Sequence, residues 1–411
     1  MSERDELVAP NPLDDDPDQR AAAYRVMRTQ GEVVPFPGLD GILAAVSYDS
    51  VASGLNSVND FGGSAGQEQL PEEDKHIAAI SEPRHGKVRK IINSVVAFHK
   101  SQRIEPYLGR LCDNLIDTML TEARDAGNQG VDLVEHLARP IPPAAITRLL
   151  GFPESDAGLF VDWIRESGER FQEAAASGRS IAIADSNPQM RYHVDTRIAE
   201  RLAEPMDAWP NDALSRFLST EVDGKRLGLR SIRAQIMFII GAGTDTTRNA
   251  IGNLFYRLGH HPQTYAALRS DPSSVDAAVE EALRIDAPAQ FMVRTCRRPT
   301  ELGARPIEPG QTVFMCIGAA NRDESVYQDP DVFGVDRGSR DHLSFGSGRH
   351  ICPGAGLARM EIRIALRAFL SRVVSFHMAD PVFHPMPVAM LLGPQTLRIV
   401  IDEEAPMKPR Q

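Results

Sequence analysis

The segment Phe345-Gly346-Ser347-Gly348-Arg349-His350-Ile351-Cys352-Pro353-Gly354 constrains the fold of this chain more than any other stretch. Its glycines permit a tight loop with backbone dihedrals that other residues rarely adopt. Pro353 is predicted to be the first residue of a helix, the position where proline is best tolerated. The helix then continues through LARMEIRIALRAFLSRV. The fold must therefore bring a glycine loop, a cysteine and a helix start to one place.

Cys352 lies where its thiolate form is favoured. The N-terminus of a helix has free N–H groups and a partial positive charge, both of which stabilise the thiolate over the thiol. A thiolate can bind a metal or act as a nucleophile. For an isolated cysteine, a small buried side chain at a helix start is the more common interpretation. A zinc site is a further alternative, but His350 and Cys352 supply only two ligands and no second pair has tetrahedral-site spacing.

A long helix is predicted over Leu229 to Leu258, ended by Gly259 and Pro262. Its middle part, residues 242–247 with the sequence AGTDTT, combines residues that a helix interior normally avoids.

Three features of this segment point to a cofactor site. Ala242 and Thr246 are four apart, so they share a face, and the Thr246 hydroxyl can bond the Ala242 carbonyl and loosen the helix. Gly243 removes side-chain bulk, which would let a flat cofactor and a diatomic ligand approach. Asp245 offers a proton source, although Arg248 could pair with it. A polar patch on a bent helix is the alternative interpretation.

Two charged pairs have helical spacing. Glu281 and Arg284 lie at i and i+3 on a helix that Ser273 or Ser274 is predicted to cap and that ends before Pro288. A lone pair of this kind is most often a solvated surface contact. His85 and Arg89 are four apart and share a face, which a solvated basic helix would also explain.

Together these segments resemble the cytochrome P450 family. FGSGRHICPG resembles the family's haem-binding loop, residues 242–247 are similar to its oxygen-activating groove, and Glu281-Ala282-Leu283-Arg284 looks like its ExxR element. Asp336-Arg337 looks like the arginine that completes the ExxR triad, although Gly334 stands where the family commonly has an acid. His85 and Arg89 match an HxxxR pattern. These five elements follow the family's order between Glu82 and Gly354, and general correspondences extend from about Asp16 to Ile401.

The resemblance implies a role for each matched residue. Cys352 would ligate the iron of haem b, with Phe345 packed against it and Ala242 bordering the cofactor. The haem propionates would bind His85, Arg89, Arg294 and His350. Asp245 and Thr246 would deliver protons during oxygen activation. Glu281, Arg284 and Arg337 would be structural and hold the cysteine loop.

The resemblance also implies where a substrate binds. The pocket would be lined by the loop near Leu70 to Ile80 and by Phe238, Ala242, Gln290, Phe291, Met292, Val293 and the stretch Leu392 to Gln395. Most of these side chains are apolar, as small-molecule pockets usually are. Gln290 and Gln395 would orient one carbonyl or hydroxyl of the substrate.

The implied activity is that of a monooxygenase, with a place in secondary metabolism. It would use O2 and two electrons from a ferredoxin-type donor with its reductase to hydroxylate an apolar small molecule. A peroxide-driven peroxygenase is one alternative, although the acid-plus-threonine pair speaks against it. A haem-based sensor without turnover is a second, and ring coupling or desaturation by the same oxidant is a third.

The predicted fold is mainly α, a multihelical P450-like fold with a minor β portion. Strands are expected near Ile42 to Ser47, Thr312 to Ile317 and Leu397 to Ile401. No composition break divides the chain, so one domain is expected over residues 1–411, with about 1–15 and 402–411 loosely ordered.

Charge and composition exclude several classes of protein. Asp and Glu outnumber Lys and Arg by 56 to 45, a formal net charge of −11, which argues against a nucleic-acid binder. No run approaches the roughly 18 apolar residues of a membrane span. The N-terminal MSERDELVAP has no apolar signal region. Four cysteines without paired spacing suit a reducing compartment, so a cytoplasmic location is expected.

Overall fold

The computed structural model describes residues 11–63, 65–97, 101–337, 341–386 and 388–406. Helices dominate it and strands are short, which confirms the predicted fold class. The α-helices are α1 Pro17–Gln30, α2 Tyr48–Asn56, α3 Ala65–Glu68, α4 Arg84–Val96, α6 Glu105–Ala126, α7 Ile141–Leu150, α8 Ala157–Ala176, α9 Ile183–Ser186, α10 Pro188–Ala203, α11 Ala213–Ser219, α12 Leu229–His260, α13 Pro262–Ser270, α14 Val275–Ile285, α15 Ile317–Ala320 and α16 Ala355–Arg372.

The strands gather in small sheets. They are β1 Val33–Pro35, β2 Ile42–Ala45, β3 Phe61–Gly62, β4 Val131–Asp132, β5 Glu221–Val222, β6 Lys225–Arg226, β7 Met292–Cys296, β8 Thr300–Leu302, β9 Arg305–Ile307, β10 Thr312–Met315, β11 Val373–Met378, β12 His384–Pro385, β13 Pro394–Thr396 and β14 Arg398–Glu404.

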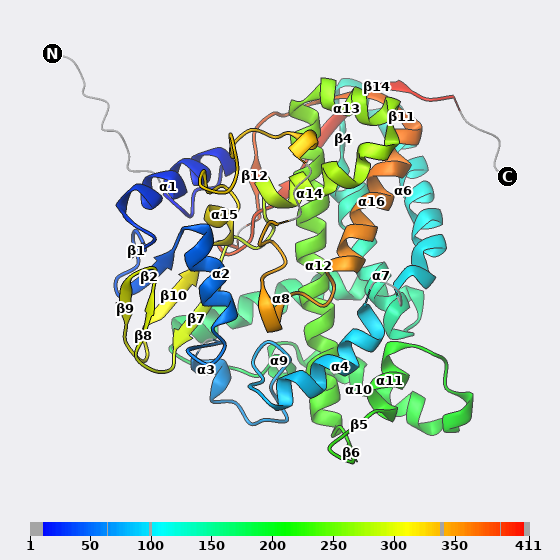
Figure 1. The fold of residues 1–411 in the computed structure, drawn as a ribbon. Helices are drawn as coiled ribbons and strands as arrows, with labels where there is room; N and C mark the ends of the chain where they lie inside the picture. The colour runs from blue at the N-terminus through cyan, green and yellow to red at the C-terminus, as the bar shows by residue number, and fades with distance from the viewer. Residues whose placement is uncertain (1–10, 64, 98–100, 338–340, 387, 407–411) are drawn as a thin grey trace.

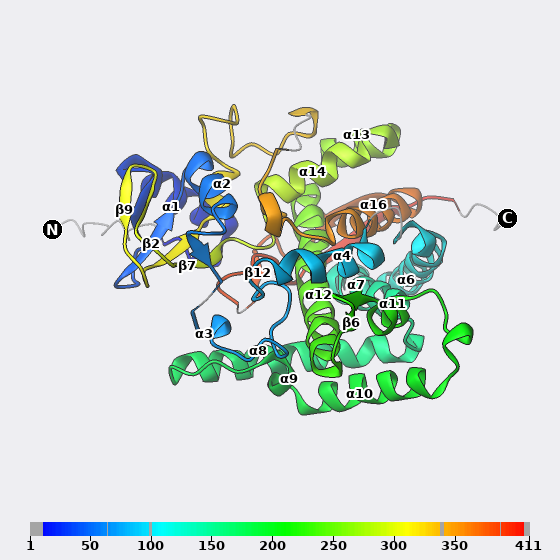
Figure 2. The same ribbon diagram turned by 60° about the horizontal axis from the view of Figure 1, so that its bottom comes forward.

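Helix α12 runs through the middle of the molecule (Figure 1). The other long helices pack around it, with α8 and α10 crossing on one side (Figure 2). The prediction of a helix from Leu229 is confirmed, but the helix passes Gly259 and ends at His260, before Pro262. A Cβ at Gly259 would lie 2.5 Å from the Met378 Sδ atom, so this glycine serves packing against β11 and does not end the helix.

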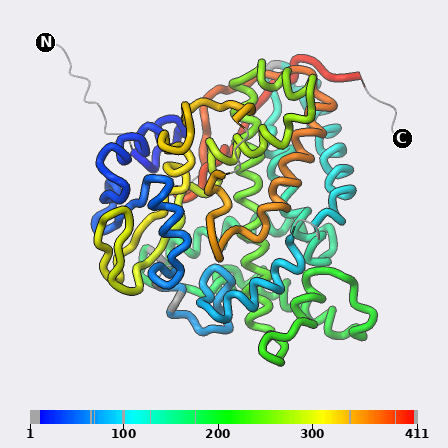
Figure 3. Tube along the Cα trace, in the orientation of Figure 1, coloured from blue at the N-terminus to red at the C-terminus, as the bar shows by residue number. Residues whose placement is uncertain are grey.

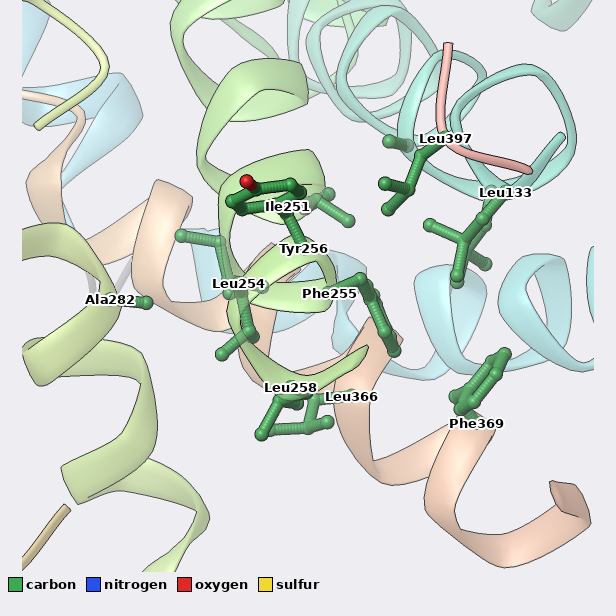
Figure 4. Close-up of a cluster of buried hydrophobic side chains, with 14 of the residues drawn as sticks. Leu133, Ile251, Leu254, Phe255, Tyr256, Leu258, Ala282, Leu366, Phe369 and Leu397 are labelled. Carbon is green, nitrogen blue, oxygen red and sulfur yellow. The ribbon is translucent and has the colours of Figure 1, made fainter. Parts of the chain in front are cut away.

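The largest apolar core lies where α12, α14 and α16 meet. Figure 4 shows Phe255 of α12 beside Phe369 of α16, and the two ring centroids are 4.8 Å apart. Leu133 and Leu397 reach the same core from segments far away in the sequence. This core fixes residues 250–258 of α12 relative to α16, the helix that follows Cys352.

A five-stranded sheet with the order β1-β2-β10-β7-β3 forms the second part of the fold. Strand β10 pairs with β2 in parallel and with β7 antiparallel, so the N-terminal region and residues near 300 lie side by side (Figure 3). The predicted strands near Ile42 and Thr312 are confirmed as β2 and β10. The strand predicted near Leu397 is confirmed as β14, which pairs with β11.

Helix starts differ from two predictions in detail. Helix α16 begins at Ala355 with Gly354 as its N-cap, so Pro353 lies in a turn before the helix and is not its first residue. Helix α14 begins at Val275 after a short 3-10 turn. Ser274 occupies its N-cap position, but the Ser274 side chain makes no capping hydrogen bond. The predicted end before Pro288 is confirmed.

The ends of the described chain are more ordered than expected. Asp16 caps α1 by accepting hydrogen bonds from the N–H groups of Asp18 and Gln19. Strand β14 continues to Glu404, and Asp402 lies 2.7 Å from the His377 Nδ1 atom. The expectation of loose order is therefore wrong for residues 402–404. Residues 1–10 and 407–411 lie outside the described residues, and the single-domain organisation stays a prediction.

Within the described ranges, no helix combines the length and the apolar composition that crossing a membrane requires.

We expect Phe369→Ala to lower the free energy of unfolding by about 3–5 kcal/mol, because the Phe369 ring is fully buried among Phe255, Tyr265 and Phe376. Denaturant unfolding of the purified protein measures the loss. Leu159→Ala is the control: Leu159 is 43% exposed, so its removal should change stability by no more than about 0.5 kcal/mol. Equal losses in both variants would contradict this assignment of the core.

Candidate active site

A cavity separates α12 from the Cys352 loop. Its volume is about 290 Å³, close to the lower end of the roughly 300–1,000 Å³ of typical small-molecule pockets. Aliphatic side chains form most of its wall, and Phe238 projects into it from α12. Cys352, Thr246 and Arg294 all line this one cavity, although more than a hundred positions separate the first two in sequence.

The Cys352 loop adopts the conformation that its glycines permit. Gly346 and Gly348 have positive φ angles of 74° and 67°, as expected for a tight glycine loop. At Gly348 a Cβ would lie 2.0 Å from the Asn56 Oδ1 atom, so only glycine fits there. The Cys352 N–H donates to the Phe345 carbonyl at 2.8 Å, which closes the loop.

The Cys352 sulfur lies deep in the protein but is accessible from the cavity. Burial raises the pKa of its thiol. The N–H groups of Gly354 and Ala355 and the charges of Arg89 and Arg359 lower that pKa, because each favours the thiolate. The predicted helix-start environment is therefore present, although the helix itself begins at Ala355.

Basic side chains gather at one end of the cavity. The His85 and His350 rings lie 4.0 Å apart between centroids, and Arg294 lines the same end. Burial lowers the pKa of His350 to about 4, with His85 and Arg294 adding to the effect. Burial likewise lowers the pKa of Arg294. Its guanidinium donates to the carbonyl of the preceding residue, Val293, at 3.0 Å.

An unsatisfied polar atom marks this end as a binding site for an anion. The His85 Nε2 atom is buried and has no hydrogen-bond partner, while its Nδ1 atom lies 3.3 Å from the Glu82 carboxylate. Such buried polar atoms are normally paired. Arg89 donates to the Ile351 carbonyl and also faces the cavity. The propionates of a haem would supply the anionic partners, so the four predicted residues fit that cofactor.

The opposite wall is the middle of α12. The Thr246 hydroxyl donates to the Ala242 carbonyl at 2.9 Å, the bond expected from their spacing, and α12 stays continuous there. Ala242 faces the cavity. Gly243 also lines the cavity, and it has a second reason to be glycine: a Cβ there would lie 2.9 Å from the Ile146 Cδ1 atom of α7.

Asp245 is half-buried next to Thr246. Burial raises the pKa of its carboxyl, and the charges of Arg248 and Arg139 partly offset that rise. The expected ion pair with Arg248 is absent from the described part of the chain. Arg248 instead donates to the Pro394 and Gln395 carbonyls at 3.1 and 3.2 Å.

The structure brings Glu281, Arg284 and Arg337 together. Arg284 donates to both Glu281 carboxylate oxygens at 2.8 Å, and the Arg337 Nε atom lies 3.4 Å from Glu281 Oε1. The Gly334 N–H also donates to Glu281, at 2.9 Å. All three side chains are well shielded, so this cluster is not the solvated surface pair that the spacing alone would favour.

Only part of the expected substrate pocket lines the cavity. Phe238 and Met292 do, as do Ile77 and Ala78 of the loop at 70–80. Gln290 does not: it is buried, accepts a hydrogen bond from the Tyr24 hydroxyl at 3.2 Å and donates to the Ala287 carbonyl.

Three further residues point away from the cavity. Phe291 stacks on Phe314 at 4.5 Å in a separate core, and Val293 packs against that core. Gln395 is exposed on β13. Side chains alternate along a strand, so Met292 and Arg294 of β7 face the cavity while Val293 faces the other side.

The sequence reasoning missed several wall residues and one buried acid. Ile146, Ile239, Ala250, Leu283, Ile317 and Glu361 line the cavity. Glu361 lies in the apolar run of α16, and burial raises the pKa of its carboxyl well above the usual value. The sequence feature that could have revealed Glu361 is an acidic residue on an otherwise apolar face of the predicted helix.

Three comparisons with known proteins agree. The sequence model described as Cytochrome P450 matches residues 187–395. The chain is 32% identical over 310 residues to Cytochrome P450 107B1 of Saccharopolyspora erythraea, covering 75% of this chain and 72% of that protein. It is 28% identical to the Steroid C26-monooxygenase of Mycolicibacterium smegmatis, covering 94% and 93%.

A solved structure, a mutant of P450 EryK in complex with erythromycin B, superposes with a TM-score of 0.83. It is 29% identical to this chain, and the match covers 96% of this chain and 99% of that one.

We expect His85→Phe to speed haem loss to an acceptor protein by on the order of tenfold or more, since a hydrogen bond to a charged group contributes about 1.5–3 kcal/mol. Phenylalanine keeps the ring contact with His350 but removes the Nε2 donor. His76→Phe is the matched control, because His76 is also buried with an unpaired Nδ1 but stacks on Phe238 at 4.2 Å, away from the basic end. Equal rates for wild type and His85→Phe would contradict the assignment.

Proposed function

The chain belongs to the cytochrome P450 family, and from this premise we propose that it hydroxylates an apolar small molecule, using O2 and two electrons from a separate protein. The observation that supports this most strongly is the single cavity that exposes the Cys352 sulfur on one side and Thr246 on the other. The wall between them is mainly aliphatic.

Cys352 would be the protein's ligand to the haem iron, and haem with a thiolate ligand supplies the reductive cleavage of O2. Among the described residues, no group of three or more His, Cys, Asp or Glu could hold a metal ion. A single accessible thiolate is enough to ligate the iron of a haem, because the porphyrin macrocycle already binds that iron. The basic end formed by His85, Arg89, Arg294 and His350 would bind the propionates.

Asp245 and Thr246 would hold and pass protons to the oxygen-binding side of the cavity. The raised pKa of Asp245 brings its carboxyl closer to neutral pH, where it can both take up and release a proton. Arg248 is occupied by main-chain carbonyls, so among the described residues Asp245 has no ion-pair partner in contact with it. Thr246 would then orient water, since its own proton is used for the Ala242 carbonyl.

The electrons would come from a ferredoxin-type donor with its reductase. Basic and apolar groups surround the outer side of the Cys352 loop: Ile351 is 46% exposed, and Lys90 and Arg349 lie on the surface. This surface complements an acidic donor. Lys87 is less available, since its ammonium pairs with Asp223 at 2.6 Å. We place the enzyme in the cytoplasm, which suits its four free cysteines.

The substrate would be a bulky apolar molecule. The relatives point the same way, because one is named for steroid oxidation and a structural neighbour holds erythromycin B. The cavity offers Phe238, Ile239, Met292 and Ile317 on the substrate side, and none of these carries a charge. A spectral-shift screen with steroids, macrolides and terpenoids tests the class, and tightest binding of small polar compounds would contradict it.

We expect Cys352→Ser to abolish the red-shifted Soret band of the ferrous carbon monoxide complex, because serine cannot supply the thiolate. The absorption spectrum after reduction measures this, with haem content determined separately. Cys316→Ser is the control, since Cys316 is buried away from the cavity. A Cys352→Ser variant that kept the band would place the iron ligand elsewhere.

We expect Thr246→Ala to uncouple turnover, so that NAD(P)H is still consumed while most electrons leave as hydrogen peroxide. The physical reason is the loss of the hydroxyl that orders water beside the oxygen-binding space. Product and peroxide per NAD(P)H are measured with added redox partners and a substrate from the screen. Thr244→Ala is the control, because the Thr244 hydroxyl bonds Ile240 within α12 and Thr244 does not line the cavity. An unchanged product ratio in Thr246→Ala would overturn this role.

A further inference from the structure

Glu280, the residue before the ExxR glutamate, joins two elements that flank Cys352. It lies on α14 and is buried. Its Oε1 atom accepts from the Arg359 Nε atom at 2.6 Å, and its Oε2 atom accepts from Arg359 Nη2 at 2.8 Å and from His342 Nε2 at 3.1 Å. His342 precedes the cysteine loop and Arg359 lies on α16, one turn into the helix after it.

The carboxylate of Glu280 is held in its charged form. Burial alone would raise its pKa, but the hydrogen bonds from His342 and Arg359 lower that pKa to about 2. The contact with Arg359 uses two parallel hydrogen bonds, the geometry that fixes a guanidinium most firmly.

The hydrogen bonds of His342 determine its tautomer. The Ser344 N–H donates to the His342 Nδ1 atom at 3.3 Å, so Nδ1 carries no proton and Nε2 donates to Glu280. His342 therefore bridges the loop backbone and the carboxylate.

The segment that leads into the cysteine loop is tied down residue by residue. The Leu343 N–H donates to the Asn321 side chain at 2.7 Å, and the Ser344 hydroxyl donates to the Leu283 carbonyl at 2.6 Å. Phe345 follows, and its carbonyl accepts from the Cys352 N–H.

Arg359 reaches the thiolate environment through Phe345. Its guanidinium carbon lies 4.4 Å from the centroid of the Phe345 ring. Among the described residues, the side-chain hydrogen bonds of Glu280 come from Arg359 and His342. The charge of Arg359 also acts on the Cys352 thiol and favours its thiolate form.

The ExxR cluster has other partners. Arg284 bonds the Asn321 and Pro330 carbonyls, and Arg337 bonds the Asp329 and Val332 carbonyls. None of these four carbonyls belongs to residues 342–352. Glu281 and Glu280 are neighbours on α14, but it is Glu280 that bonds His342, in the segment that leads into the cysteine loop.

We propose that Glu280, His342 and Arg359 act together as positioning residues that fix the cysteine loop and set the reduction potential of the haem through the charge of Arg359. The proposal rests on Cys352 being the iron ligand, as proposed above.

The expected effect has a definite sign. Reduction adds one negative charge to the iron–thiolate unit, so a cation nearby favours the reduced state and an anion disfavours it. In the wild type Glu280 partly cancels Arg359. Removing the charge of Glu280 uncovers the cation, and removing Arg359 leaves the buried anion uncompensated.

Spectroelectrochemistry of the holoenzyme tests this, without any need for turnover. We expect Glu280→Gln to raise the equilibrium constant for reduction about threefold and Arg359→Gln to lower it about threefold, or about 28 mV each way at 59 mV per tenfold change for one electron. The double variant should have a potential between those of the two single variants. Arg363→Gln is the control on the same helix: Arg363 pairs with Glu105 at 3.3 Å and should leave the potential unchanged.

A purely structural role predicts a different pattern. It would loosen the loop in both single variants, so both potentials would move in the same direction and the double variant would be worst. That result, or no shift in either variant, overturns the proposal.

If Arg359→Gln fails to retain haem, the comparison of Arg359→Lys with Glu280→Gln tests the proposal instead. Arg359→Lys should keep the wild-type potential, because lysine keeps the positive charge, while Glu280→Gln should still raise the potential. A potential of Arg359→Lys that shifts as far as that of Glu280→Gln would overturn the charge argument. A wild-type protein without the thiolate band would instead refute ligation by Cys352.

Discussion

As the proposed iron ligand, the Cys352 thiolate would be a charge inside a largely apolar cavity, and several neighbouring groups would compensate that charge. An isolated ion in such a place costs several kcal/mol, so it persists only with hydrogen bonds and opposite charges near it. Here the N–H groups of Gly354 and Ala355 face the sulfur, and Arg89 and Arg359 supply positive charge. The glycines of the loop let the backbone turn tightly enough for those N–H groups to point inward.

The basic end of the cavity needs a bound anion, whereas the Cys352 thiolate needs positive charge near it. Burial lowers the pKa of His85, His350 and Arg294, and the charges of His85 and Arg294 lower that of His350 further. A protein that folded around these groups alone would keep buried basic groups whose charged forms are disfavoured, with an unpaired His85 nitrogen. An anionic group bound there would favour the charged forms, so binding of such a group and stability of this region would be coupled.

Features that depend on local spacing were predictable from the sequence, and features that depend on distant segments were not. The Thr246–Ala242 bond, the Glu281–Arg284 pair and the turn at Gly346 follow from residues at most a few positions apart. The contacts of Gly243 with Ile146 and of Gly259 with Met378 are revealed by no local pattern. Val293 was misplaced because strand alternation and the pairing of β7 with β10 decide which side chains face the cavity. Gln290, which precedes β7, was misplaced because its side chain bonds Tyr24 and the Ala287 carbonyl.

The contacts of Glu280 illustrate the same limit, since its partners His342 and Arg359 lie 62 and 79 residues away. They also show how one short helix serves two purposes. Glu281 turns toward Arg284 and Arg337 and fixes the long segment before the cysteine loop, whereas Glu280 turns toward the loop and α16. Because adjacent residues on a helix point about 100° apart, a single rigid element can hold both segments in a fixed relation. Any shift of α14 would therefore move the loop backbone and the charge of Arg359 together, which couples the geometry of the thiolate to its electrostatic environment.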